Sequence, residues 1–202
     1  MQELLKTLLG WDYAAWYYLN TVWHNDVLDA IVPYLRNQWT WAPLYLFLLL
    51  FMTINFGRKG VMWCVFFLLT FAIADQLSAS LIKPYVHRLR PCNNPYLQQF
   101  VHLLVPCGSG YSFPSSHAAN HFALAVFGSI TWQRHGKWIW PASLLWATSV
   151  AYAQVYVGVH FPLDVVCGGI LGALAGILTA KVYNKVYGLT KKEKTETIAS
   201  VR

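Results

Sequence analysis

The stretch from residue 39 to residue 82 decides the fold class. Residues 39–56 read WTWAPLYLFLLLFMTINF, residues 57–60 read GRKG, and residues 61–82 read VMWCVFFLLTFAIADQLSASLI. A membrane-spanning helix needs about 20 mostly apolar residues, so this stretch predicts two spans joined by a short basic turn. Residues 114–132, 138–157 and 164–187 have the same apolar character. We therefore expect an all-α integral membrane bundle with about five spanning helices.

The composition agrees with a membrane protein of one domain. Of the 202 residues, 56% are hydrophobic and only 11% are charged, whereas about a quarter of an average soluble domain is charged. The formal net charge is +7, but the cations lie in short loops and in a tail rather than along one soluble face. This distribution is typical of chains beside anionic lipid headgroups. We expect membrane lipids as partners and no nucleic acid, and the sequence leaves the oligomeric state open.

The basic connectors predict the topology. Residues 57–60 and 133–137 are short and basic, and the tail 188–202 carries Lys191, Lys192 and Lys194. By the positive-inside rule these segments lie in the cytoplasm. Threading five spans from that side brings three polar motifs, at residues 83–90, 114–117 and 160–164, to the opposite face.

The first 36 residues have a different pattern. Apolar residues recur near helical spacing among charged ones: Leu4, Leu5, Leu8, Leu9, Trp11, Ala15, Trp16 and Leu19. This pattern suits an amphipathic helix that lies at the membrane interface. Residues 26–36 contain Asp29 and Pro33 and are too short to span. We expect two interfacial helices in residues 1–36, a catalytic bundle in residues 39–187 and a basic tail, with a sixth span as the alternative reading of the N-terminus.

Two of the four cysteines, Cys92 and Cys107, fall in the loop of residues 91–113 on the motif side. In an oxidising compartment they could form a disulfide; the alternative is two unpaired thiols. Cys64 and Cys167 lie within spans, where buried thiols behave as small apolar groups.

The first polar motif, residues 83–90, can supply positive charge to a phosphate. Arg90 offers a planar fork for two oxygens, and Lys83 offers a compact point charge. Arg88 either adds a third cation or only anchors the helix end against headgroups.

The second motif is Pro114-Ser115-Ser116-His117. Proline is favoured at the first position of a helix, which puts both serines in a first turn where unpaired N–H groups and the helix dipole favour an anion. His117 follows, where it can give or take a proton. The alternative reading is an ordinary helix start with serine caps.

The third motif places His160 just before a helix that starts near Pro162, with Asp164 in its first turn. A carboxylate there can accept one imidazole N–H and leave the other nitrogen as a nucleophile. A lone His-x-x-x-Asp is more often structural, but ionisable pairs at the mouth of a membrane bundle are usually functional. The spacing of the seven histidines indicates no metal-ligand set, so we expect no metal.

Together the motifs resemble the type-2 phosphatidic acid phosphatase superfamily of lipid phosphate phosphatases over about residues 39–187. Its pattern is Lys-x6-Arg-Pro, then Pro-Ser-(Gly/Ser)-His, then Ser-Arg-x5-His-x3-Asp. The resemblance implies that His160 forms a phosphohistidine, Asp164 orients it, and His117 protonates the leaving group. It also implies metal-free and cofactor-free catalysis, with the phosphate held by Lys83, Arg90, Ser115 and the amides of Ser116 and His117.

One departure concerns the third motif, where Ala153-Gln154 replaces Ser-Arg. Gln154 can still donate through its amide, and Arg88 is a candidate for the missing charge. We expect an active phosphatase with altered preference; the alternative class is a lipid-phosphate binding or carrier protein. The resemblance favours undecaprenyl diphosphate as the substrate in a bacterial inner membrane, hydrolysed at the outer face, with a cytoplasmic C-terminus. Phosphatidate, phosphatidylglycerol phosphate and lipid A phosphate are the alternatives.

Overall fold

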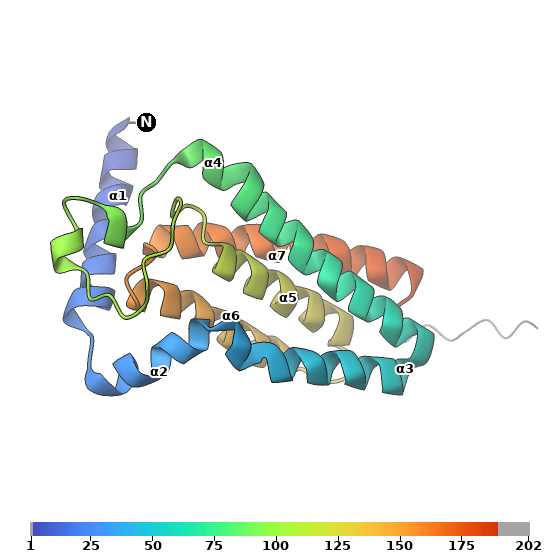
Figure 1. Ribbon diagram of the computed structural model, residues 1–202. Coiled ribbons are helices and arrows are strands. Elements are labelled where there is room, and N and C mark those ends of the chain that lie inside the picture. The colour runs from blue at the N-terminus through green and yellow to red at the C-terminus, as the bar shows by residue number, and fades with distance from the viewer. Residues whose placement is uncertain (1, 190–202) are drawn as a thin grey trace, which may run out of the picture.

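The computed structural model describes residues 2–189, and over that range the chain is helical without strands. The main elements are α1 (Gln2–Trp16), η1 (Tyr17–Val22), α2 (Asp26–Arg36), α3 (Gln38–Asp75), η2 (Gln76–Ile82), α4 (Lys83–Val86), α5 (Ser116–Trp132), α6 (Ile139–Tyr156) and α7 (Pro162–Val186). Figure 1 shows α5, α6, α7 and the two limbs of α3 side by side in one bundle. The expected all-α membrane bundle is confirmed.

The two limbs of α3 form a helical hairpin that turns at Gly57, which has φ 50° and ψ −129°. Glycine alone adopts such a conformation without a steric penalty. A Cβ on Gly60 would lie 1.8 Å from the carbonyl oxygen of Met52, so the turn closes only around a residue without a side chain. The second limb continues through η2 into α4, which delivers Lys83 to the other end of the bundle (Figure 1).

Helix α7 approaches α5 closely along a stripe of glycines, one per turn. A Cβ on each of them would come within 2.0 to 2.5 Å of a carbonyl oxygen of Ser115, Ala119 or Ala123; these glycines are Gly168, Gly172 and Gly176. Small residues at this spacing let membrane helices pack backbone to backbone. The starts of both helices meet as a result, and the Ser115 amide donates to the Asp164 carbonyl at 2.9 Å.

The outer surface of the bundle is apolar. Exposed side chains include Ile54 at 78%, Leu145 at 72% and Leu174 at 61% of their full area. Two helical stretches in the described residues, Gln38–Asn93 and Pro162–Val186, are long and apolar enough to cross a membrane; α5 has 17 residues and α6 has 18. Hydrocarbon is the solvent that such a surface needs.

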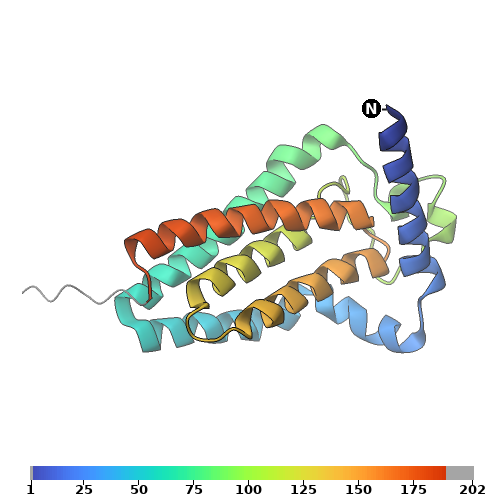
Figure 2. The ribbon, with the colours of Figure 1, turned by 180° about the vertical axis from the view of Figure 1, so that it is seen from behind.

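The N-terminal helix α1 lies across the end of the bundle and is not a sixth limb of it (Figures 1 and 2). It exposes Leu4, Leu5, Leu8 and Trp11 but buries Trp16 against the ring of Phe161, with ring centroids 5.8 Å apart. Asn20 is fully buried, and its amide donates to the carbonyl oxygens of Tyr156 at 2.6 Å and His102 at 2.8 Å. The first 36 residues are therefore part of the packed structure.

The opposite end of the bundle holds the Gly57 turn, the α5–α6 connection and the last turn of α7 (Figure 2). The basic turns at residues 57–60 and 133–137 thus share one end, as the positive-inside argument requires. The lysines of the tail, Lys191, Lys192 and Lys194, lie outside the described residues.

Candidate active site

The three polar motifs meet at one end of the bundle. Lys83 Nζ lies 3.4 Å from Ser116 Oγ, which links the first motif to the second. Arg90 donates from Nη1 to the Val159 carbonyl at 3.4 Å, which links the first motif to the third. Segments that are up to about eighty residues apart in sequence therefore line a single site.

The centre of the site is the pair of His160 and Asp164. His160 is 2% exposed, and its Nδ1 lies 3.5 Å from Asp164 Oδ2 and 3.3 Å from Ser112 Oγ. Asp164 is fully buried and accepts hydrogen bonds from the Ser112 hydroxyl and, at 2.9 Å, from the Phe161 amide. A carboxylate on the Nδ1 side fixes the ring and leaves Nε2 as the nitrogen that can attack. Ser112 was not predicted, since a serine in a loop has no distinguishing sequence signal.

The surroundings of His160 keep its ring neutral. Burial and, to a smaller extent, the charges of Arg90 and Lys83 lower the pKa of His160 to about 4, although Asp164 opposes this shift. An imidazole that is uncharged at neutral pH has the lone pair that a nucleophile needs.

Asp164 is also held by Arg88, whose Nη1 donates to Asp164 Oδ1 at 2.7 Å. The same guanidinium pairs through Nη2 with Asp12 of α1 and stacks on the ring of Phe161, with Cζ 4.0 Å from the ring centroid. Both ends of its fork are therefore occupied by carboxylates. These pairs favour a role for Arg88 in holding Asp164 over the expected roles of binding phosphate or replacing the missing arginine. Asp12 was not predicted as a site residue because α1 was interpreted only as an interfacial helix. Its position between Trp11 and Trp16, among apolar residues, was a sign that its carboxylate is buried and paired.

The start of α5 has the geometry expected for an anion site. Ser115 is the N-cap and accepts from the Ala118 amide at 3.4 Å, so the Ser116 amide lies in the first turn with the dipole behind it. Two buried donors nearby, Arg90 Nε and Gln154 Nε2, have no hydrogen-bond partner within the described structure. A buried donor without a partner is costly, and an oxyanion would satisfy both.

His117 is half-buried in the first turn of α5, and the charges that act on its ring are those of Arg36, His160, His121 and Arg90. His121 lies one turn deeper, where its Nδ1 contacts the His117 carbonyl at 2.8 Å and its Nε2 contacts Tyr45 Oη at 3.3 Å. Both ring nitrogens of His121 therefore have partners inside the bundle, whereas His117 lies in the first turn of α5, beside Ser116.

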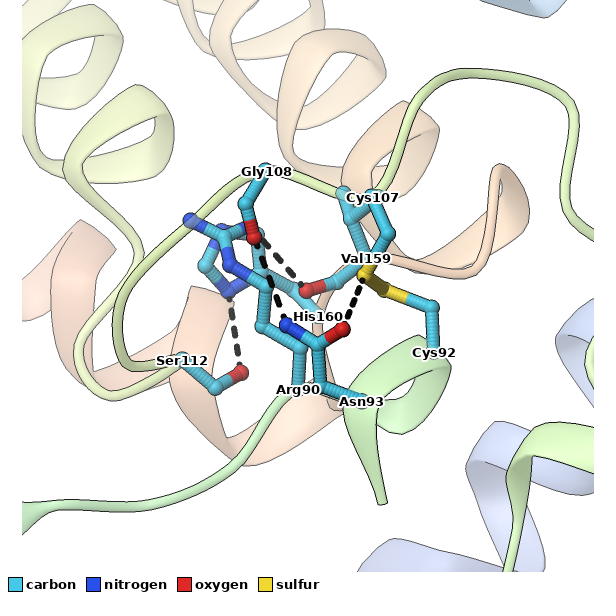
Figure 3. Close-up of a disulfide and its surroundings, with 8 residues drawn as sticks. All are labelled: Arg90, Cys92, Asn93, Cys107, Gly108, Ser112, Val159 and His160. Carbon is cyan, nitrogen blue, oxygen red and sulfur yellow. Dashed lines mark hydrogen bonds between the residues drawn. A yellow bond between two sulfur atoms is a disulfide. The ribbon is translucent and has the colours of Figure 1, made fainter. Parts of the chain in front are cut away.

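A disulfide joins Cys92 to Cys107, with their Cα atoms 6.0 Å apart. Figure 3 shows it beside Arg90 and His160. It closes residues 93–106, and Asn93 adds a 3.4 Å hydrogen bond from its amide to the Gly108 carbonyl. The disulfide thus constrains the segment that leads to Ser112, which contacts both His160 and Asp164.

Three possible metal ligands gather beside the site, although the sequence indicated none: His24, Asp29 and His102, with ligand atoms within 4.8 Å of one another. The rings of His24 and His102 are stacked at 4.1 Å and 14°, so their in-plane lone pairs run parallel and do not converge on one ion. Asp29 is already bonded to Tyr156 Oη at 2.6 Å and His102 Nε2 at 2.8 Å. This cluster fits a hydrogen-bonded link between α2, the loop and α6 better than a metal centre.

Comparison with known proteins agrees with this geometry. Residues 62–187 match the PAP2 superfamily. Curated relatives include the lipid A 4'-phosphatase of Bacteroides thetaiotaomicron, 33% identical over 81% of this chain and 73% of that protein. Another is the undecaprenyl-diphosphatase of Sulfolobus acidocaldarius, 30% identical over 78% of this chain and 70% of that protein.

Two solved structures have the same fold. The crystal structure of Aquifex aeolicus LpxE is 29% identical and superposes with a TM-score of 0.63, covering 82% of this chain and 92% of that one. The transmembrane PAP2 type phosphatidylglycerolphosphate phosphatase of Bacillus subtilis is 22% identical with a TM-score of 0.68, covering 89% of this chain and 88% of that one. The fold, the site and these matches together define a membrane phosphatase. The chain belongs to the PAP2 superfamily, as its three motifs indicated.

Proposed function

We propose that this phosphatase removes phosphate from a membrane lipid through a phosphohistidine on His160, without a metal ion. The observation that carries the proposal is a buried, neutral His160 whose Nδ1 faces Asp164, next to buried donors that lack partners. A neutral nucleophile beside unsatisfied donors suits attack on a phosphate, whose negative charge those donors would stabilise.

The proposed reaction has two steps. His160 Nε2 attacks phosphorus, the P–O bond to the lipid breaks, and His117 transfers a proton to the leaving oxygen. Asp164 accepts the Nδ1–H and stabilises the positive ring. Water then attacks the phosphohistidine while His117 takes its proton, which releases inorganic phosphate and restores both histidines. Lys83, Arg90, Ser115 and the amides of Ser116 and His117 would neutralise and hold the phosphate oxygens.

For the substrate we favour a lipid A phosphate. Two relatives, from Bacteroides thetaiotaomicron and Porphyromonas gingivalis, are named lipid A 4'-phosphatases and are 33% and 34% identical to this chain. The undecaprenyl diphosphate that the sequence motifs suggested is the second candidate, supported by the Sulfolobus acidocaldarius relative. Phosphatidylglycerol phosphate is a third, through a Bacillus subtilis relative at 26% identity.

We further propose that the chain is a single domain in a bacterial inner membrane, with the three motifs carried by residues 39–187. In this arrangement the site faces the outer side, and the basic turns and the C-terminus face the cytoplasm. The exposed leucines and Trp11 of α1 would lie among headgroups, which suits an amphipathic helix that crosses the bundle end.

The test is phosphate release from lipid A, undecaprenyl diphosphate, phosphatidylglycerol phosphate and phosphatidate, each with EDTA. Wild type should turn over at least one of them, and His160→Ala should turn over none. His135→Ala, in the turn at the opposite end of the bundle, is the matched control and should behave as wild type. A wild-type protein that is silent on every lipid would favour the alternative class of a binding or carrier protein, and loss of activity in EDTA would contradict the metal-free mechanism.

A further inference from the structure

The site lacks one arginine that its family pattern carries, and the structure brings another arginine, Arg36, into contact with the residue at that position. Gln154 stands where the pattern has arginine, is fully buried, and accepts a hydrogen bond at Oε1 from Arg36 Nε at 3.3 Å. Its backbone carbonyl accepts from the amides of Val159 at 3.3 Å and His160 at 3.2 Å. Gln154 therefore connects the nucleophile's backbone to an arginine from a distant helix.

Helix α2 brings Arg36 to this position by packing along α6. Val32 is buried against Ala153, Tyr156 and Val157, and Asp29 accepts a 2.6 Å hydrogen bond from the Tyr156 hydroxyl. Arg36 is the last residue of α2, one turn beyond Val32. Its place beside Gln154 follows from a fixed helix pair, not from a chance side-chain conformation.

The charge of Arg36 has no carboxylate partner among residues 2–189, where its one hydrogen-bonded side-chain partner is Gln154. Burial lowers the pKa of Arg36, and the nearby charge of Arg90 lowers it further. Among the charges that act on the His117 ring, that of Arg36 has the largest effect, ahead of those of His160 and Arg90. Arg36 and Arg90 therefore act on each other with like charge, which an anion in the site would offset.

Arg88 gives the contrast. Its guanidinium is neutralised by Asp164 and Asp12 on either side, so it adds no net positive charge for a ligand. Arg36 and Arg90 face neutral groups, a glutamine amide and a backbone carbonyl. The positive charges of Arg36 and Arg90 are therefore the ones that a bound phosphate would neutralise.

We propose that Arg36 is a phosphate-binding residue of this active site, oriented by Gln154 and taking the place of the missing arginine. The ligand is the phosphate monoester group of the substrate, so the inference rests on the proposed function. Arg36 lies outside residues 62–187, the part that matches the family, so the N-terminal segment completes the phosphate site.

The experiment compares wild type with Arg36→Gln, Arg36→Lys and the double variant Arg36→Gln/Gln154→Arg. The readouts are KM for the best lipid phosphate, inhibition by orthovanadate, and the thermal shift that orthophosphate or orthovanadate produces in detergent. Arg58→Gln, an exposed arginine in the turn at the far end, is the matched control. The anion-induced thermal shift needs no turnover, so it tests Arg36 even if no lipid is hydrolysed.

We expect Arg36→Gln to weaken the binding of orthovanadate about 10-fold to 100-fold, as loss of a charge-assisted contact does. Arg36→Lys should fall between this variant and wild type because it keeps the charge and loses the fork. The double variant should recover most of the loss, because the arginine returns from the neighbouring position. Arg58→Gln should match wild type.

Two results would overturn the inference. One is an Arg36→Gln variant that binds orthovanadate within twofold of wild type. The other is a double variant that binds orthovanadate as weakly as Arg36→Gln although both unfold at the wild-type temperature, because an arginine at position 154 would then fail to do what Arg36 is proposed to do. Failure of the proposed function has a different signature, namely a wild type that hydrolyses no lipid phosphate yet retains Arg36-dependent anion binding.

Discussion

The ion pairs of Arg88 give the sharpest stability prediction, since this side chain joins Asp12 of the N-terminal helix to Asp164. Arg88→Ala would leave two carboxylates in a poorly hydrated place. The Asp164 side chain is 0% exposed, and that of Asp12 is 4% exposed. Neither has another cation as a partner in the described structure that could take over the role of the guanidinium.

The expected cost follows from these exposures. Breaking a buried pair by removing one partner typically costs about 3–5 kcal/mol, because a buried charge is left without compensation. Arg88 also loses its stacking on Phe161. For a protein of this size each kcal/mol lowers Tm by about 2–4 °C, so Arg88→Ala should unfold roughly 6–20 °C below wild type.

The assay is thermal unfolding in one detergent, followed by tryptophan fluorescence, together with turnover measured well below the lower Tm. Turnover should fall steeply in Arg88→Ala, because Asp164 loses the group that holds Oδ1. Arg58→Ala removes an exposed arginine and should leave both quantities unchanged. A variant with an unchanged Tm and a raised KM would refute the reasoning, because that is the behaviour of a phosphate-binding arginine.

Three further predictions test the site and the packing beneath it. Asp164→Asn should lower kcat on the order of 10⁴-fold, as mispositioning of an imidazole does, with phosphate release as the measure and retained cooperative unfolding as the control. Gly172→Ala would place a Cβ 2.0 Å from the Ala119 carbonyl oxygen and should cost about 1–3 kcal/mol, whereas Gly128→Ala, which meets nothing within 4 Å, should not lower Tm. The pKa of His160 falls from 6.5 to about 4 on folding, so the unfolded chain binds more protons between these values, and the stability contributed by this residue decreases as pH falls from 6.5 to 4. Unfolding of His160→Ala should therefore depend less on pH in that window, and an equally steep dependence would contradict the buried, neutral ring.

The bundle was predictable because hydrocarbon imposes a simple rule on sequence. Each span must pair its own backbone hydrogen-bonding groups and be mostly apolar, so residues 39–82 predicted two helices. The turn at Gly57 followed from the basic tetrapeptide GRKG. Packing was less visible: the glycines of α7 are recognisable as a small-residue stripe, but only the structure shows that α5 is the helix they contact.

The residues of the candidate site that lie close together in sequence could be predicted from the spacing of the motifs. Contacts between residues far apart in sequence could not. His160 and Asp164 are one helical turn apart, so their pairing is local. Asp12 is 76 residues from Arg88, and nothing in the intervening sequence predicts that these two side chains are in contact. The same holds for Arg36 and Gln154, which are 118 residues apart. The sequence expectation assigned Arg88 the role of spare cation because it was near in sequence, whereas the structure has Arg36 near in space.

These long-range contacts change the role of the N-terminal segment. If α1 and α2 only anchored the protein to a membrane surface, their apolar residues would suffice, and polar side chains would remain hydrated. Instead Asp12 is 6% exposed and Asn20 is fully buried. Asp12 pairs with Arg88, which also holds Asp164, and Asn20 donates to the carbonyl of Tyr156 at the end of α6. Burial of polar groups is favourable only where the partners are fixed, so the segment must be docked for Asp164 to keep its geometry. Because Asp12 contacts both Arg88 and the start of α7, differences in substrate among relatives should be sought in the first 36 residues as well as in the three motifs.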